Sequence, residues 1–284
     1  MTSQQRIGVI GAGTMGSGIA QTCAVVGLAV TMIDVDDAAV SRGRNAVSSG
    51  LERLVKKAAI SASDMDAALA RISGSTDYDA LKTCDFIIEA ATENEALKAK
   101  ILKQVDDLAR PEAILATNTS SISITKLAAA TKRPERFIGV HFFNPVPMMA
   151  LVELIRGLQT DDTTVLAASE LAKRLRKTPI VVKNSPGFIV NRLLCPMLNE
   201  AVFAYSEGFA SAQQIDDGMK LGCNHPIGPL ALADLIGLDV LLAVMEVFYR
   251  DFNDPKYRPA PLLKEMVAAG YLGRKSGRGF YAYA

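Results

Sequence analysis

Two ionisable residues stand within apolar stretches of the chain, where charged groups are costly to bury. His141 ends the run "RFIGVH", and Glu153 lies inside "LVELI". The other histidine, His225, lies in the turn-like sequence "CNHPIGP". A carboxylate buried without a partner destabilises a fold, so we expect Glu153 to pair with His141. Such a pair fixes the tautomer of the imidazole and suits the ring to act as a general base.

A glycine-rich turn near the start of the chain has the spacing of a nucleotide-binding loop. Gly11, Gly13 and Gly16 form G-x-G-x-x-G between an apolar run and a helical stretch, and Asp34 ends the next apolar run, about twenty residues further on. N–H groups at the start of such a helix bind a pyrophosphate, and the acidic residue binds the adenosine ribose hydroxyls. The pattern predicts NAD binding. No Arg or Lys stands between Asp34 and Arg42, so a 2′-phosphate would meet a carboxylate without a nearby cation, which favours NAD over NADP.

Composition restricts the partners and the compartment. The 284 residues include 31 Lys and Arg against 30 Asp and Glu, so no global charge attracts nucleic acid or an anionic membrane. The four cysteines form no CxxC pair, which argues against a zinc ribbon or a disulfide framework and fits the cytoplasm. The apolar stretch that starts at Ile227 contains Asp234, Asp239 and Glu246, so we expect no membrane span.

The elements that must position these groups alternate between strands and helices. Apolar runs predict strands, and most of the segments between them have helical patterns. Polar helical sequence is expected from about Asp36 to Ala70. The strands are predicted at residues 6–10, 29–34, 84–90, 113–118, 136–142, 150–157 and 178–184. Such alternation is typical of an α/β fold with a mainly parallel sheet. Beyond Pro186 only helical patterns remain, so a Rossmann-type domain of residues 1–184 is expected before an all-helical domain of residues 185–284.

Seven segments in order resemble the motifs of the L-3-hydroxyacyl-CoA dehydrogenase family, and in particular its stand-alone bacterial members that act on 3-hydroxybutyryl-CoA. The segments are "GAGTMGSGIAQ", "ATENEALK", "ATNTSSISIT", "FIGVHFFNPVPMMALVELI", "NSPGFIVNR", "HPIGPLALADLIGLD" and "GRKSGRGFY". They span nearly the whole chain. The resemblance implies NAD-dependent, reversible oxidation of an L-3-hydroxyacyl-CoA to a 3-ketoacyl-CoA, as part of fatty acid or butanoate metabolism.

The resemblance also implies roles for residues that the pattern alone leaves open. His141 matches the catalytic base and Glu153 its acidic partner. Ser120 matches a hydroxyl that bonds the substrate oxygen, and Asn191 an amide that completes the substrate site. Without the family, Ser120 is better explained as a helix N-cap, and Asn191 as a helix residue without a ligand.

Further positions match cofactor and coenzyme A contacts in the family. Glu93 and Lys98 match residues on the nicotinamide ribose side of NAD, although by themselves they suggest a solvated helix start. The remaining matches near the cofactor are Asn118, Asn144 and Lys275. The segment "RLVKKAAIS" matches the region that meets the nucleotide end of coenzyme A, through either Lys56 or Lys57, and a plain charged helix face is an equal alternative.

The sequence leaves two alternative functions open and also predicts an assembly. One alternative is a related dehydrogenase of a free hydroxy acid or sugar acid. Another is an NAD-binding protein without catalysis, which the presence of both His141 and Glu153 disfavours. The apolar stretch "LALADLIGLDVLLAVMEVF" carries more apolar surface than one small helical domain covers, so we expect a two-fold homodimer.

Overall fold

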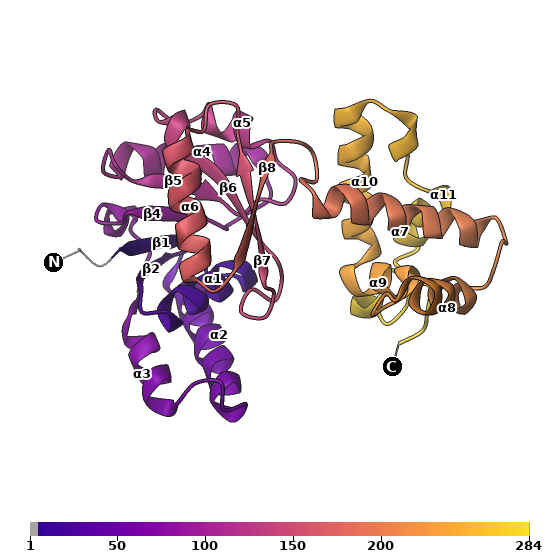
Figure 1. Ribbon diagram of the computed structural model, residues 1–284, viewed down its shortest axis with the longest axis horizontal. Helices are drawn as coiled ribbons and strands as arrows, with labels where there is room; N and C mark the ends of the chain where they lie inside the picture. Colours follow the sequence, from indigo (N-terminus) through magenta and orange to yellow (C-terminus); the bar gives the residue numbers. More distant parts are fainter. Residues whose placement is uncertain (1–4, 284) are drawn as a thin grey trace. The chain divides into compact units, whose positions relative to one another are not determined.

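The computed structural model describes residues 5–283 and divides into two compact units, Met1–Asn184 and Ser185–Ala284. The first unit is an eight-stranded sheet with helices packed on it, and the second is built of helices (Figure 1). The α/β fold with a helical second part is therefore confirmed.

The sheet is parallel in two parts that run in opposite directions. Its order is β3-β2-β1-β4-β5-β6-β7-β8; the strands from β3 to β6 are parallel, β6 and β7 are antiparallel, and β7 and β8 are again parallel to each other. The strands are β1 (Arg6–Ile10), β2 (Ala29–Ile33), β3 (Ile72–Ser75), β4 (Phe86–Glu89), β5 (Ile114–Thr117), β6 (Phe137–Phe142), β7 (Leu151–Arg156) and β8 (Thr178–Lys183). The seven predicted strands are present with small differences at their ends, and β3 was not predicted.

The polar helical sequence expected from about Asp36 to Ala70 is confirmed, and the structure divides it into two helices. The helices of the first unit are α1 (Thr14–Val25), α2 (Asp37–Lys56), α3 (Ala62–Ala70), α4 (Glu95–Leu108), α5 (Ile124–Ala128) and α6 (Asp162–Arg174). Ala58 has a left-handed backbone with φ of 54°, which a continuing helix cannot contain. Ser61 then starts α3 with a capping box that includes Asp64.

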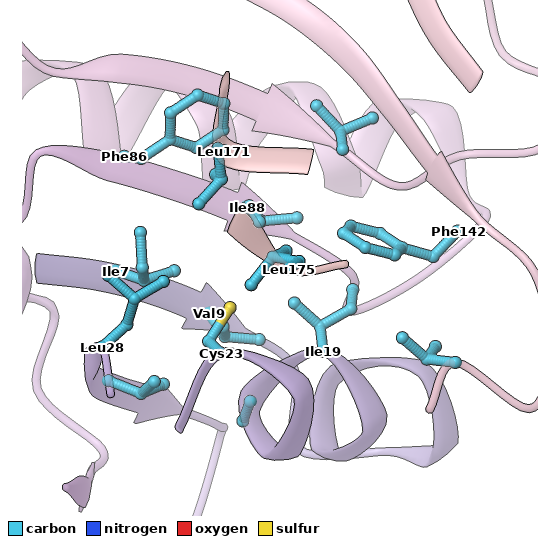
Figure 2. Close-up of a cluster of buried hydrophobic side chains, with 14 of the residues drawn as sticks. Ile7, Val9, Ile19, Cys23, Leu28, Phe86, Ile88, Phe142, Leu171 and Leu175 are labelled. Atoms are coloured by element: carbon cyan, nitrogen blue, oxygen red, sulfur yellow. The ribbon is translucent and has the colours of Figure 1, made fainter. Parts of the chain in front are cut away.

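The main core of the first unit lies between the sheet and a layer that includes α1 and α6. Ile7 and Val9 of β1 pack with Ile19 and Cys23 of α1 and with Leu171 of α6 (Figure 2). All five side chains are at most 3% exposed. Since β1 and α1 are both anchored in this core, the glycine-rich turn between them is held by packing on either side.

The second unit folds around its own apolar cluster. Its helices are α7 (Val190–Ser206), α8 (Ala212–Cys223), α9 (Pro229–Ile236), α10 (Leu238–Phe252) and α11 (Pro261–Ala268). Leu230, Leu241, Met245 and Phe248 are at most 1% exposed within this cluster. Most apolar side chains of the stretch that suggested a dimer are therefore buried in the core of this unit or packed against it.

Two buried carboxylates join elements of the second unit through hydrogen bonds. Asp216 of α8 accepts hydrogen bonds from the backbone N–H groups of Leu230 and Ala231, at 2.7 and 2.9 Å, and from the Tyr281 hydroxyl at 2.8 Å. It therefore caps the first turn of α9 from a neighbouring helix. Asp234 accepts three further hydrogen bonds from residues 280–283. The end of the described chain is thereby tied to α8 and α9.

We expect Asp216→Ala to lower the free energy of unfolding by about 2–4 kcal/mol, because it leaves two backbone donors of α9 without acceptors. Asp217→Ala is the matched control, since Asp217 bonds only exposed side chains, those of Gln213 and Lys220. Urea unfolding of both variants measures the difference. Equal midpoints for the two variants would contradict the capping role of Asp216.

Candidate active site

The carboxyl edge of the parallel sheet gathers most of the candidate residues. The C-terminal ends of β1, β2, β4, β5 and β6 meet at this edge, and the antiparallel β7 begins there. Open α/β sheets bind their ligands at this edge. The candidates that lie at or just beyond these ends are Gly11, Gly13, Asp34, Glu93, Asn118, Ser120, His141 and Asn144.

His141 and Glu153 are brought together by the register of two strands. They lie directly opposite each other in the antiparallel pair of β6 and β7, so both side chains point to the same face. His141 Nδ1 and Glu153 Oε2 are 2.7 Å apart, and the residues are 7% and 0% exposed. The contact expected from the sequence is present. Because Nδ1 bonds the carboxylate, proton exchange with a substrate falls to Nε2.

Asn118 and the loop after β5 are tied to this pair. The Asn118 side-chain oxygen accepts a hydrogen bond from Phe142 N at 2.9 Å, directly beside His141. Glu93 accepts hydrogen bonds from the backbone N and the hydroxyl of Ser120, at 2.8 and 3.2 Å, and from the Thr119 hydroxyl at 2.7 Å. The helix N-cap that follows is Ser123 and not Ser120. Ser120 is thus held at the carboxyl edge by Glu93.

A second buried ion pair lies behind this loop. Lys98 is 1% exposed, and its ammonium donates to the carboxylate of Glu89 and, at 3.2 Å, to the Thr117 hydroxyl. Glu89 also accepts from Ala91 N at 2.8 Å, in the turn after β4. A solvated helix start is therefore wrong for Lys98. The sequence analysis missed Glu89, although a carboxylate that ends the apolar run "DFIIE" is the same signal that drew attention to Glu153.

The glycine-rich turn fits a dinucleotide. A Cβ atom on Gly13 would meet no atom within 4 Å, so its backbone is open to a ligand, whereas one on Gly16 would lie 1.7 Å from the Gly11 oxygen. Gly16 therefore allows the turn to close, and Gly13 leaves room for a pyrophosphate. Asp34 accepts hydrogen bonds from Ala12 N and Val35 N at 2.6 and 2.7 Å, which fixes its carboxylate beside the turn.

The hollow beside this turn contains a cation that the sequence analysis did not expect there. Arg42 of α2 lines the same pocket as Gly13 and Asp34, with a volume of about 260 Å³. The expectation that no cation lies near the ribose position is therefore wrong. Arg42 follows Asp34 by eight positions in the sequence, and both residues line one hollow because α2 begins directly after β2.

A second cavity lies further along α1. It has a volume of about 330 Å³ and is bounded by α1, α2 and the loop after β6, including Asn144. Of the two lysines considered for coenzyme A, Lys57 lines this cavity, while Lys56, at the end of α2, is not among its lining residues. Lys177 secures the loop, since its ammonium donates to the oxygens of Val146 and Met149 at 2.6 and 2.7 Å.

The remaining candidates belong to the second unit. Asn191 lies in the first turn of α7. Lys275 lies in a short 3₁₀ turn, Arg274–Ser276, and its ammonium bonds Asp239 at 2.7 Å. Within the described residues no group of three or more His, Cys, Asp or Glu side chains could hold a metal ion. Between residues 5 and 283, no helix is both long and apolar enough to cross a membrane.

A dinucleotide loop and a buried histidine–carboxylate pair on one sheet edge are the parts of an NAD-dependent dehydrogenase, because oxidation of an alcohol needs a hydride acceptor and a base. The NAD-binding domain of 3-hydroxyacyl-CoA dehydrogenase matches residues 6–185, and the C-terminal domain of the same enzymes matches residues 187–283. The chain belongs to the 3-hydroxyacyl-CoA dehydrogenase family.

Individual relatives agree with this assignment. The crystal structure of (S)-3-hydroxybutyryl-CoA dehydrogenase PaaH1 from Ralstonia eutropha is similar, with 66% sequence identity, a TM-score of 0.98, and coverage of 99% of this chain and 100% of that chain. The 3-hydroxybutyryl-CoA dehydrogenase of Bradyrhizobium diazoefficiens is 50% identical over 98% of this chain and 95% of its own. Mitochondrial hydroxyacyl-coenzyme A dehydrogenase of Sus scrofa is 40% identical over 98% of this chain and 91% of its own.

We expect the protein to prefer NADH to NADPH, because Asp34 would repel a 2′-phosphate. Replacing Asp34 by Ser and Val35 by Arg should shift the ratio of kcat/KM toward NADPH by at least about tenfold, or about 1.4 kcal/mol. Val35 is 86% exposed, so the arginine can be accommodated. Asp34→Ser alone should give part of the shift, since Arg42 is already in the pocket. Equal efficiency of the unmodified protein with both cofactors would contradict the placement of Asp34.

Proposed function

We propose that this protein catalyses the reversible NAD-dependent oxidation of L-3-hydroxybutyryl-CoA to acetoacetyl-CoA. The observation that carries the proposal is the buried contact of 2.7 Å between His141 and Glu153 at the carboxyl edge of the sheet. Relatives named 3-hydroxybutyryl-CoA dehydrogenase at 50% identity over 98% of the chain support the substrate class.

In the oxidising direction, His141 removes the proton of the 3-hydroxyl group through Nε2. Glu153 stabilises the imidazolium that forms, since it lies against Nδ1. NAD, held by the glycine-rich turn and Asp34, would supply the acceptor for the hydride that leaves C3 of the substrate. In the reducing direction, His141 returns the proton to the keto oxygen. Asn118 keeps the end of β6, and with it the imidazole, in place.

Ser120 and Asn191 are proposed to hold the substrate oxygen. The Ser120 hydroxyl bonds Glu93 in this structure, so a rotation of its side chain would present it to a substrate while Glu93 still bonds the Ser120 backbone. Asn191 would contribute an amide. Hydrogen bonds aimed at the oxygen where charge develops lower the barrier. Glu93, Lys98, Asn144 and Lys275 are proposed on the cofactor side of the site.

The coenzyme A part of the substrate is proposed to lie in the cavity that Lys57 lines. Arg53, one helical turn before Lys57, lines the same cavity, and two cations suit the phosphate groups of coenzyme A. A free hydroxy or sugar acid carries one carboxylate and no phosphate group, so two cations suit it less well than they suit coenzyme A. Comparing turnover of acetoacetyl-CoA with that of free acetoacetate and gulonate separates the two functions, and efficient use of the free acids would contradict the proposal.

The catalytic pair gives a direct prediction. His141→Ala should lower kcat by about 10²–10⁴-fold, the usual contribution of general acid–base catalysis. Glu153→Gln should cost less, because glutamine keeps an acceptor for Nδ1–H and loses only the charge. Steady-state reduction of acetoacetyl-CoA measures kcat, and fluorescence titration of NADH should give an unchanged Kd. A His141→Ala variant with near-normal kcat would remove the assignment.

The assembly is proposed to be a homodimer in the cytoplasm, formed through the second unit. The stretch that first suggested it lies mostly in the core of that unit, but Phe209, Leu221 and Leu235 are 85%, 87% and 52% exposed. Exposed apolar side chains of this size are typical of interfaces. The four free cysteines, three of them buried, suit a reducing compartment.

Light scattering at micromolar concentration should give a mass of about 61 kDa, twice the 30.3 kDa of one chain. An apolar interface should resist salt, because salt strengthens rather than weakens apolar association. The mass should therefore be the same at low and high ionic strength. A mass of a single chain under both conditions would contradict the dimer.

A further inference from the structure

The cavity beside α1 is lined by an amide that no described residue binds. Gln21 of α1 is 4% exposed and lines the cavity. Its side chain has no hydrogen bond to any of the residues that the structure describes between 5 and 283. Its amide atoms are not among the fully buried polar atoms that lack a hydrogen bond, so they face the open space of the cavity. A side-chain amide held in a largely buried residue and open only to a cavity is available to bind a ligand.

Gly50 of α2 makes room for this amide. A Cβ atom on Gly50 would lie 2.1 Å from Gln21 Oε1 and 3.2 Å from Nε2. Both residues line the same cavity, so the amide lies against the bare backbone of α2. Glycine within a helix costs stability relative to alanine. Here it lets the amide of Gln21 occupy the space between the two helices.

The charges around the cavity indicate what the amide would bind. Arg53 and Lys57 line it from α2, and neither forms an ion pair with any described residue. Its lining includes no acidic side chain. The pocket therefore offers two cations together with neutral side chains that can both donate and accept hydrogen bonds, namely Thr14, Ser17, Gln21 and Asn144. A ligand that combines phosphate groups with a chain containing amides matches these side chains. The phosphopantetheine arm of coenzyme A is such a ligand.

We propose that the Gln21 amide binds the phosphopantetheine arm of the acyl-CoA substrate. This inference rests on the proposed function and adds a specificity residue to it. The hollow beside Gly13 and Asp34, which suits the dinucleotide, adjoins this cavity and shares Thr14, Ser17 and Ala46 with it. Gln21 lines only the cavity and lies two helical turns beyond Gly13 along α1. Gln21 therefore acts on recognition of the coenzyme and takes no part in the chemistry at C3.

Kinetics of Gln21→Met and Gln21→Glu test the proposal. Methionine keeps the size of the side chain but cannot donate or accept strongly, so the KM for acetoacetyl-CoA should rise by about 5- to 20-fold, equivalent to one lost hydrogen bond. Glutamate should raise it further, because its charge repels phosphate. The kcat and the KM for NADH should not change.

Gly50→Ala provides a variant in which Gln21 is retained. Its new methyl group displaces the amide, so it should raise the KM for acetoacetyl-CoA without changing that for NADH. Thermal unfolding of every variant shows that the fold is kept. A KM for acetoacetyl-CoA within twofold of normal in both Gln21 variants would overturn the proposal. An increase confined to the KM for NADH would also overturn it, by assigning the cavity to the dinucleotide.

Calorimetric titration with free coenzyme A separates this inference from the proposed function. The unmodified protein should bind coenzyme A, and Gln21→Glu should bind it at least about tenfold more weakly. This result would support the role of Gln21 even if no acetoacetyl thioester were reduced, an outcome that would remove only the proposed function. Equal binding by both proteins would overturn the role of Gln21 even if acetoacetyl-CoA were reduced.

Discussion

The antiparallel pairing of β6 with β7 is the constraint on which the active site depends. The sheet is parallel up to β6, so the reversal at β7 is what sets Glu153 directly across from His141. A shift of one residue would turn Glu153 to the opposite face and leave two buried polar groups without each other. The loop between the strands is held by Lys177, whose burial lowers the pKa of its ammonium group.

Buried charge recurs at the ends of strands in this protein, and in each case a specific partner offsets the cost. Glu153 has His141, and Glu89 has Lys98 together with Thr117. Removing one member of such a pair costs about 3–5 kcal/mol, because the other charge stays buried. These pairs therefore fix the side chains at the carboxyl edge, where a base and a cofactor must be oriented.

The two units use buried carboxylates for different purposes. In the first unit they lie at the edge where the reaction is proposed to occur. In the second, Asp216 and Asp234 bind backbone N–H groups and tyrosine hydroxyls, so they join helices and the end of the chain. A carboxylate within an apolar sequence is thus a sign of structure as often as of catalysis, and its partner decides which.

The sequence by itself determined the strands, the glycine-rich turn, Asp34 and the pairing of His141 with Glu153. These follow from local patterns, because an apolar run, a G-x-G-x-x-G spacing and a charge within an apolar strand act over few residues. β3 was not predicted, because its sequence "ISGS" has no apolar run. It forms a strand by pairing with β2.

Only the tertiary structure decided the rest, because those features depend on residues distant in the chain. The packing of α2 against α1 and β2 brings Arg42 beside Asp34 and Gly50 against Gln21. The fold of α4 onto the sheet buries Lys98 with Glu89. No local pattern specifies such contacts, since each depends on how two elements pack. The sequence therefore identified the reacting groups, and the packing of the helices decided which cations and amides surround them.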